Sequence, residues 1–404
     1  MTSSPADTGR LRFGSLEALR GLMAWWVVIA HIAILTGIFN LTAGYLGPLW
    51  RATVAVNVFV MLSGFVIAHL QLSASRQTYG KYLARRAFRL WPAYLLGLIP
   101  MIVFPALYEY PFVNLPYHGD HAANVEAFQS VQENIAPHVA LHLTLLHGLV
   151  PNQILNHSDS SLLSPAWSLS LEWQFYLVAP LIIALMLRSL RWAVGIVIGC
   201  ATLTTIMASQ NYLTWDFRSF LLSSIIFFAI GIFSRIYIRE IAAALRGRRS
   251  VVIQIIVVLA ALVFIDGFTD YTLGRELAMW LIAMHAVANE IGATRGHRGV
   301  DKIGAAAMAV LSWRPLRHLG EISYSTYILH IPVIAAWFWL FGRGDTSLSQ
   351  TAAVAIGVTS VIPIYLVSLA SHRLIERPFI RFGAKLTGPT KAVHEEPQPA
   401  GGQA

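Results

Sequence analysis

Charged residues are scarce in this chain of 404 residues. They make up 12% of it, against about 25% in soluble proteins. Hydrophobic residues make up 56%, and the mean hydropathy is +0.60. This composition excludes an ordinary soluble domain and predicts a polytopic membrane protein. We attribute the net charge of +9 to basic loops at one membrane face, and we expect no nucleic-acid partner.

Cysteine is almost absent too. The single cysteine, Cys200, lies in an apolar run, so no disulfide can form within the chain. The first apolar run is too long for the core of a cleaved signal peptide. It also lacks a small-residue cleavage site after it, so we interpret it as a retained first span.

The apolar runs predict an all-α transmembrane bundle of about ten spans. We place these spans at residues 15–38, 51–71, 87–107, 167–187, 192–210, 217–238, 250–268, 273–291, 319–341 and 350–372. If the N-terminus is cytoplasmic, 25 of the 29 basic residues fall at the cytoplasmic side. Only four remain outside, namely Arg51, Arg218, Arg275 and Arg343. This asymmetry predicts that both termini are cytoplasmic.

The segment 108–166 contains no lysine or arginine, and we predict an extracytoplasmic loop that shapes a pocket. Its short apolar piece, 138–150, fits an interfacial or re-entrant helix. The spacings His118-x-x-His121 and His138-x-x-x-His142 are compatible with metal ligation. A polar lid is the simpler interpretation, and we assign no metal. Residues 1–385 are expected to form one transmembrane domain, and 386–404 a disordered cytoplasmic tail.

Two ionisable residues interrupt the first predicted span. Arg20 and His31 are about three helical turns apart, so they share one helix face at a separation of about 16 Å. Ionisable groups inside a span are costly and are candidates for function. The predicted orientation places Arg20 near the cytoplasmic surface and His31 beyond the midplane. A histidine that only packs against a neighbouring helix is the alternative for His31.

Six motifs follow one another along the chain. They are Leu16-Glu-Ala-Leu-Arg20-Gly with His31, Val58-Phe-Val-Met-Leu-Ser63-Gly64, Arg85-Arg86-Ala-Phe-Arg89-Leu-Trp-Pro92, Trp167-Ser-Leu-Ser-Leu-Glu172-Trp-Gln174-Phe-Tyr, Ile322-Ser-Tyr-Ser-Thr-Tyr-Ile-Leu-His330-Ile-Pro332 and Ile375-Glu376-Arg-Pro378. Through these motifs the chain resembles the acyltransferase-3 family of integral-membrane acyltransferases over about residues 15 to 381. Glu17 and Trp173 depart from the family pattern, in which an aspartate and a second acid are common.

The resemblance implies a catalytic role for His31. As a general base it would take the proton of an acceptor hydroxyl, and a covalent acyl-histidine is the alternative scheme. Glu172 is predicted at a depth similar to that of His31. It either orients His31 or caps the start of its own helix, where a carboxylate is favoured.

Three arginines precede the third predicted span. Arg85 fits ordinary anchoring at the cytoplasmic face, whereas Arg86 and Arg89 share a helix face and suit phosphate binding. In the family this Arg-x-x-Arg pattern is linked to the use of acyl-CoA, and Arg20 is a further candidate contact. Two more residues, Ser63 and His330, are candidates for lining a tunnel. Ser63 lacks the elbow motif of a serine nucleophile, and packing is an equal alternative for His330.

The expected function is transfer of an acyl group, acetyl in particular, from cytosolic acyl-CoA to a hydroxyl of an extracytoplasmic or membrane-linked glycan. Acyl-CoA is a donor substrate here, and no bound cofactor is expected. The expected location is the bacterial inner membrane. One alternative acceptor is a small molecule such as a macrolide or lipid. A transporter is the alternative from another class, but it predicts internal repeats, which the sequence does not show.

Overall fold

The computed structural model describes residues 13–73, 78–115, 121–245, 273–292, 298–342 and 348–388, and these ranges contain helices and no strand. The long and medium helices are α1 (Gly14–Leu35), α2 (Ile38–Leu46), α3 (Ala52–Ser73), α4 (Tyr79–Val103), α5 (Pro105–Asn114), α6 (His121–Glu133), α7 (Ile135–Leu143), α8 (Trp167–Met186), α9 (Leu190–Ser209), α10 (Ile225–Ile236), α11 (Ile238–Ala244), α13 (Leu273–Glu290), α14 (Arg298–Leu311), α15 (Arg314–Glu321), α16 (Ser323–Gly342), α17 (Gln350–Thr359), α18 (Val361–Ser371) and α19 (Arg377–Thr387). The predicted all-α class is thus confirmed for the described ranges.

Seven helical segments in the described ranges are long and apolar enough to cross a membrane. They are Gly14–Leu35, Ala52–Leu72, Tyr79–Val103, Ser164–Met186, Leu190–Ser209, Ser323–Gly342 and Gln350–Thr387. Each corresponds to one of the predicted spans. The predicted span 217–238 contains only a shorter apolar helix, Ile225–Ile236, and 250–268 lies outside the described residues. The predicted span 273–291 coincides with α13, which carries three charged residues. The total of ten spans and the cytoplasmic termini stay predictions.

The third span begins eight residues earlier than the predicted start at 87. Helix α4 starts at Tyr79, after Thr78 in an extended conformation. The Tyr79 hydroxyl donates to the carbonyl oxygen of Leu177 in α8 at 2.8 Å, which fixes this first turn against a neighbour. The prediction from hydropathy starts this span at residue 87 because the arginines before it lower the local hydropathy. Because those arginines lie in the second and third turns, they are inside the helix and not at its start.

Two pairs of helices cross at glycines. Antiparallel α3 and α10 meet at Gly64 and Gly231, where an added Cβ would overlap the backbone carbonyl oxygens of Phe228 and Met61 respectively. Helices α1 and α15 meet at Gly21 and Gly320 in the same way. Small residues let helix backbones approach closely, and this packing is a main source of helix association in membranes. Each crossing lies beside a candidate site residue, since Gly21 follows Arg20 and Gly64 follows Ser63.

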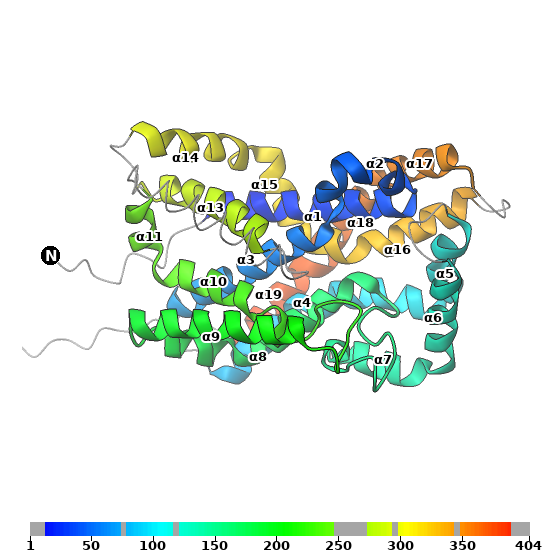
Figure 1. Cartoon of the computed structure of the whole chain (residues 1–404), viewed down its shortest axis with the longest axis horizontal. Helices are drawn as coiled ribbons and strands as arrows, with labels where there is room; N and C mark the ends of the chain where they lie inside the picture. Colours follow the sequence, from blue (N-terminus) through cyan, green and yellow to red (C-terminus); the bar gives the residue numbers. More distant parts are fainter. Residues whose placement is uncertain are drawn as a thin grey trace, which may run out of the picture.

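Three short helices and two connecting segments lie together at one end of the helix bundle. Figure 1 shows α5, α6 and α7 gathered at the end opposite α11 and α14. Two connecting segments, 150–164 and 210–219, are hydrogen bonded to each other there. The backbone N–H of Asn152 donates to Thr214 O at 2.8 Å, and the buried carboxylate of Asp159 accepts from the Phe217 N–H at 2.9 Å and from Ser219 Oγ at 2.9 Å. Burial raises the pKa of Asp159 to about 6.

The predicted loop 108–166 contains the helices α6 and α7, and four of its histidines, His138, His142, His147 and His157, have protein partners. His142 Nδ1 donates to the carbonyl oxygen of His138 at 2.9 Å, and His138 Nδ1 lies 2.9 Å from Ser161 Oγ. The rings of His142 and His147 stack with centroids 4.0 Å apart. No group of three or more potential metal ligands occurs in the described part of the chain. His118 lies outside the described residues.

The glycine crossing predicts a steric effect on stability. Substitution Gly231→Ala adds a methyl group against the backbone of α3, and such overpacking costs about 1–3 kcal/mol. We expect a lower thermal midpoint for the purified protein in detergent. Gly199→Ala is the matched control, because Gly199 also lies inside a helix but has no neighbour within 4 Å. Equal midpoints for the two variants would contradict the crossing.

Candidate active site

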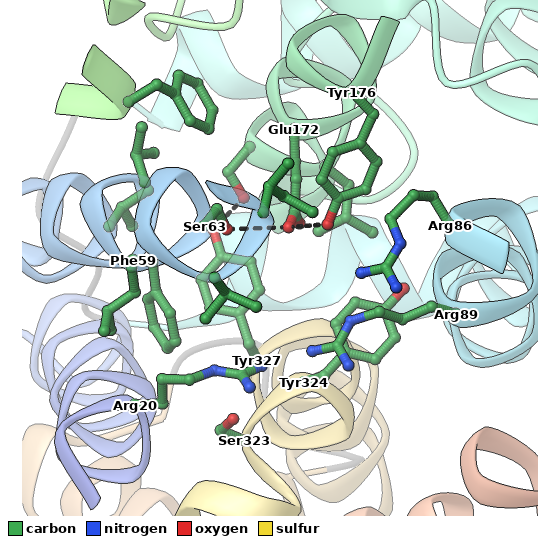
Figure 2. Close-up of a pocket in the computed structure, with 18 residues that line it drawn as sticks. Arg20, Phe59, Ser63, Arg86, Arg89, Glu172, Tyr176, Ser323, Tyr324 and Tyr327 are labelled. Carbon is green, nitrogen blue, oxygen red and sulfur yellow. Dashed lines mark hydrogen bonds between the residues drawn. The ribbon is translucent and has the colours of Figure 1, made fainter. Parts of the chain in front are cut away.

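A cavity opens among α1, α3, α4, α8 and α16, and we call it the arginine cavity (Figure 2). Its charged and hydrogen-bonding side chains include Arg20, Ser63, Arg86, Arg89, Glu172, Tyr176, Tyr324 and Tyr327. The remaining wall is mainly apolar, with Phe59 and Phe228 among its members. A concave, largely apolar site with a few converging polar groups is the usual form of a ligand pocket.

Three guanidinium groups point into the arginine cavity from two helices (Figure 2). Arg20 comes from α1, and Arg86 and Arg89 come from successive turns of α4. In the described part of the chain no carboxylate lies within 4.0 Å of these groups, and the buried Nε of Arg86 has no hydrogen-bond partner. The Arg86 guanidinium carbon lies 5.8 Å from the centroid of the Tyr176 ring. Three converging cations without an ion pair in the described ranges have the chemistry that anion binding requires.

Glu172 supplies the carboxylate of the cavity wall. Its Oε1 accepts a hydrogen bond from Ser63 Oγ at 2.9 Å and another from the Tyr176 hydroxyl. It interacts electrostatically with Arg20 and Arg89 over a longer distance. In the described part of the chain these hydrogen bonds of Glu172 and those of His31 go to different groups, so a role of Glu172 in orienting His31 stays a prediction. Glu172 lines the same cavity as Arg86 and Arg89 of α4.

His31 pairs with another histidine. Helix α1 is continuous from Gly14 to Leu35, which confirms that Arg20 and His31 share one helix. The ring of His31 lies 5.0 Å from that of His330 in α16, with His31 Nδ1 3.3 Å from His330 Nε2. His31 Nδ1 also lies 2.9 Å from Val27 O, and His330 Nδ1 lies 2.7 Å from Tyr327 O.

These contacts assign the tautomers, because a carbonyl oxygen can only accept. Both Nδ1 atoms therefore carry hydrogen. His330 Nε2 is then an acceptor that faces the Nδ1–H of His31, and His31 Nε2 keeps its lone pair. An imidazole held in this tautomer, and half-buried as His31 is, has the lone pair that a general base needs.

Tyr327 connects the histidine pair to the arginine cavity. Its side chain lines the cavity, while its backbone oxygen accepts from His330. The Tyr327 hydroxyl is held by Ser168 Oγ at 2.8 Å and by Pro165 O at 3.2 Å. A single residue thus contacts both parts of the candidate site. Of the residues predicted from the sequence, the structure gathers Arg20, Ser63, Arg86, Arg89 and Glu172 in the cavity and sets His31 with His330 beside it.

Sequence reasoning missed the acidic residue of the last motif. The motif Glu376-Arg377-Pro378 is one of the six motifs, but Glu376 is not among the predicted site residues. In the structure Glu376 is buried in a π-helical turn, η6 (His372–Glu376), and its carboxylate binds Ser325 Oγ and His372 Nδ1, each at 3.0 Å. It also acts electrostatically on Arg20 and Arg89. The signal in the sequence was a carboxylate next to an apolar span, since ionisable residues in spans mark functional sites. The π-helical turn, a feature that is frequent at functional sites, is visible only in the structure.

The tyrosines were missed as well. Tyr176 lies one turn after Glu172, and Tyr324 and Tyr327 lie in the first turns of α16. Aromatic residues in spans are mostly packing or interfacial residues, so a tyrosine in a span does not by itself indicate a site residue. Their positions inside two of the six motifs were the only signal.

Together these features define a class, namely a helical membrane protein with an arginine-lined cavity next to a histidine pair. A family model described as an acyltransferase domain matches residues 13–369. The chain belongs to this acyltransferase-3 family and is a membrane acyltransferase.

Two relatives are similar over most of this chain. The peptidoglycan O-acetyltransferase OatA of Listeria monocytogenes is 23% identical over 91% of the chain and 56% of its own length. A Komagataeibacter xylinus protein named "Putative membrane-bound transacylase BcsY" is 24% identical over 90% of the chain and 81% of its own length. The chain thus spans little more than half of the first relative. No solved structure matches the chain.

The arginine cavity predicts stabilisation by a simple anion. Inorganic pyrophosphate should raise the free energy of unfolding, by about 2.7 kcal/mol when its concentration is about 100 times its Kd. Arg89→Gln should weaken this effect, which is measured as a thermal shift in detergent. Arg188→Gln is the control, because the Arg188 guanidinium lies over the Trp192 ring and does not line the cavity. Equal shifts in both variants would rule out the cavity as the anion site.

Proposed function

We propose that this protein is an O-acyltransferase that moves an acetyl group from cytosolic acetyl-CoA to a hydroxyl of an extracytoplasmic or membrane-linked glycan. The observation that carries the proposal is the unpaired arginine cluster next to the His31–His330 pair. The cluster favours a multiply charged donor, and the neutral histidine supplies a base for the acceptor. The bacterial inner membrane is the proposed location.

The donor occupies the arginine cavity in this proposal. Phosphate groups of CoA accept charge-assisted hydrogen bonds from Arg20, Arg86 and Arg89. The long, flexible pantetheine arm then extends along α1. It needs to cover about 16 Å, the axial rise between Arg20 and His31, to bring the thioester to the histidine pair.

The reaction itself is an acyl transfer. His31 Nε2 takes the proton of the acceptor hydroxyl while that oxygen attacks the thioester carbonyl carbon. The new C–O ester bond forms, the C–S bond breaks, and CoA leaves as a thiolate that recovers the proton from the imidazolium. His330 Nε2 accepts from the His31 Nδ1–H and so stabilises the charged ring. In the alternative scheme the acyl group first forms a bond to His31.

The acceptor proposal draws support from the relatives. One of them is named for O-acetylation of peptidoglycan, although the chain spans only 56% of its length. A small molecule or lipid acceptor is the alternative within the same chemistry.

The central prediction concerns His31. His31→Ala removes the proposed base, and we expect acyl transfer to fall by about 100- to 10,000-fold while membrane insertion is kept. Mass spectrometry of surface glycans from cells that produce each variant measures the transfer. His318→Ala is the matched control, because His318 lies in α15 and binds Tyr365, away from the cavity. Normal glycan acylation with His31→Ala would exclude the mechanism. CoA release by the purified wild type distinguishes an acyltransferase from a transporter.

A further inference from the structure

A second cavity, of about 350 Å³, lies at the end of the bundle that carries α5, α6 and α7, and we call it the outer cavity. Four separate parts of the chain build it: Met101 of α4, one face of α6, the segment 157–164, and the pair Asp216–Phe217. The two connecting segments are hydrogen bonded to each other, as described above. The outer cavity is thus a formed site, and the mechanism proposed so far does not use it.

Helix α6 presents one face to the outer cavity. Asn124, Phe128 and Gln132 line it at i, i+4 and i+8, the spacing of a single helix face. The side-chain amides of Asn124 and Gln132 make no hydrogen bond within the described part of the chain. Each amide offers two donors and one acceptor to a ligand.

The opposite wall holds an ion pair. His157 Nδ1 lies 2.6 Å from Asp216 Oδ2, and Asp216 also accepts from Asn152 Nδ2 at 2.8 Å and from Ser160 Oγ. The hydrogen bond between His157 and Asp216 raises the pKa of His157. Burial alone would raise the pKa of Asp216, but its three hydrogen bonds outweigh burial and lower it. Because Nδ1 is engaged, His157 Nε2 remains for a ligand.

The backbone here is strained in a way that favours a site. His157 and Leu162 adopt φ values of 55° and 54°, in the left-handed region that residues other than glycine rarely occupy. Strain of this kind persists where the surroundings fix it, and it concentrates at binding and catalytic sites. At His157 the surroundings are Asn152 and Asp216, so the strained residue is the one that the hydrogen bonds hold.

The chemistry of the outer cavity fits a neutral, hydroxyl-rich ligand. Amides, serine hydroxyls and a carboxylate pair with hydroxyl groups, and no lysine or arginine lines the cavity. Phe128 and Phe217 supply apolar surface, and Phe217 is fixed by stacking on Trp167 with centroids 5.5 Å apart. A sugar ring has both surfaces, polar edges and apolar faces. The arginine cavity offers the opposite chemistry, since its three guanidinium groups select an anion.

The linings of the two cavities come close together along the chain. Ser164, the first residue of the turn η4 (Ser164–Ala166), lines the outer cavity, and Ser168, just after this turn, lines the arginine cavity. Within that turn, Pro165 O accepts from the Tyr327 hydroxyl, and the backbone of Tyr327 binds His330. The turn η4 therefore connects the lining of the outer cavity to the arginine cavity and, through Tyr327, to the histidine pair.

We propose that the outer cavity is the acceptor site and binds a neutral sugar unit through the amides of Asn124 and Gln132, the His157–Asp216 pair and the rings of Phe128 and Phe217. This inference rests on the proposed acyltransferase function, because it names the site at which the glycan acceptor of that reaction is held.

Direct binding tests the inference. The full-length protein in detergent is titrated by calorimetry with three neutral probes, chitotetraose, cellotetraose and maltotetraose. We expect at least one of them to bind. In the double variant Asn124→Ala/Gln132→Ala we expect the Kd of that probe to rise about tenfold, because two hydrogen bonds are lost. Acetyl-CoA binding should be unchanged in the same variant, since neither amide lines the arginine cavity.

Gln129→Ala is the matched control. Gln129 lies on the exposed face of the same helix and does not line the cavity, so its substitution should leave the Kd unchanged. The inference is overturned if none of the three probes binds the wild type, or if the double variant binds them as tightly as Gln129→Ala does. Failure of the proposed function has a different signature, namely no CoA release from acetyl-CoA with any acceptor, whatever the calorimetry shows.

Discussion

The candidate site depends on how closely two pairs of helices can approach. Helices α3 and α10 touch backbone to backbone at Gly64 and Gly231, and α1 and α15 do so at Gly21 and Gly320. In a bilayer, helices gain little from the hydrophobic effect between them, so contact at this distance is a main source of association. Arg20 and Ser63 each precede one of these glycines. Any displacement of a crossing therefore moves a polar group of the arginine cavity.

The arginines of the cavity are balanced by carboxylates that do not pair with them directly. Buried guanidinium groups are costly, and here they are balanced by carboxylates at a distance, Glu172 and Glu376, without a direct ion pair in the described ranges. Direct pairing would neutralise the cavity and leave little attraction for a ligand. Hydrogen bonds from Ser63 and Tyr176 instead hold Glu172, and Ser325 and His372 hold Glu376. The arginines thus remain available to an incoming anion.

Much of this arrangement could be predicted from the sequence, and the failures have physical causes. The length of the apolar runs predicted seven of the long helices. The prediction that Arg20 and His31 share one helix is confirmed, because helical periodicity is a local property of the sequence. The start of α4 was misplaced because hydropathy cannot tell an arginine that faces a cavity from one at a membrane surface. The His31–His330 contact joins residues that are far apart in the sequence, so it had no local signal.

Charge separates the chemistry of the two cavities along the bundle. The arginines of α1 and α4 line one cavity, whereas amides, hydroxyls and one histidine–carboxylate pair line the other, at the end of the bundle with α5 to α7. A single cavity would suit only one of the two ligands, because a phosphate favours cationic partners and a neutral sugar favours amides and hydroxyls. In the proposed reaction the turn Ser164–Ala166 lies between the two cavities, so both ligands could be held at once and only the uncharged reacting atoms would need to meet. These atoms are the thioester carbon and a hydroxyl oxygen. A neutral histidine suits such a junction, because it can accept a proton there without carrying a permanent charge in the membrane.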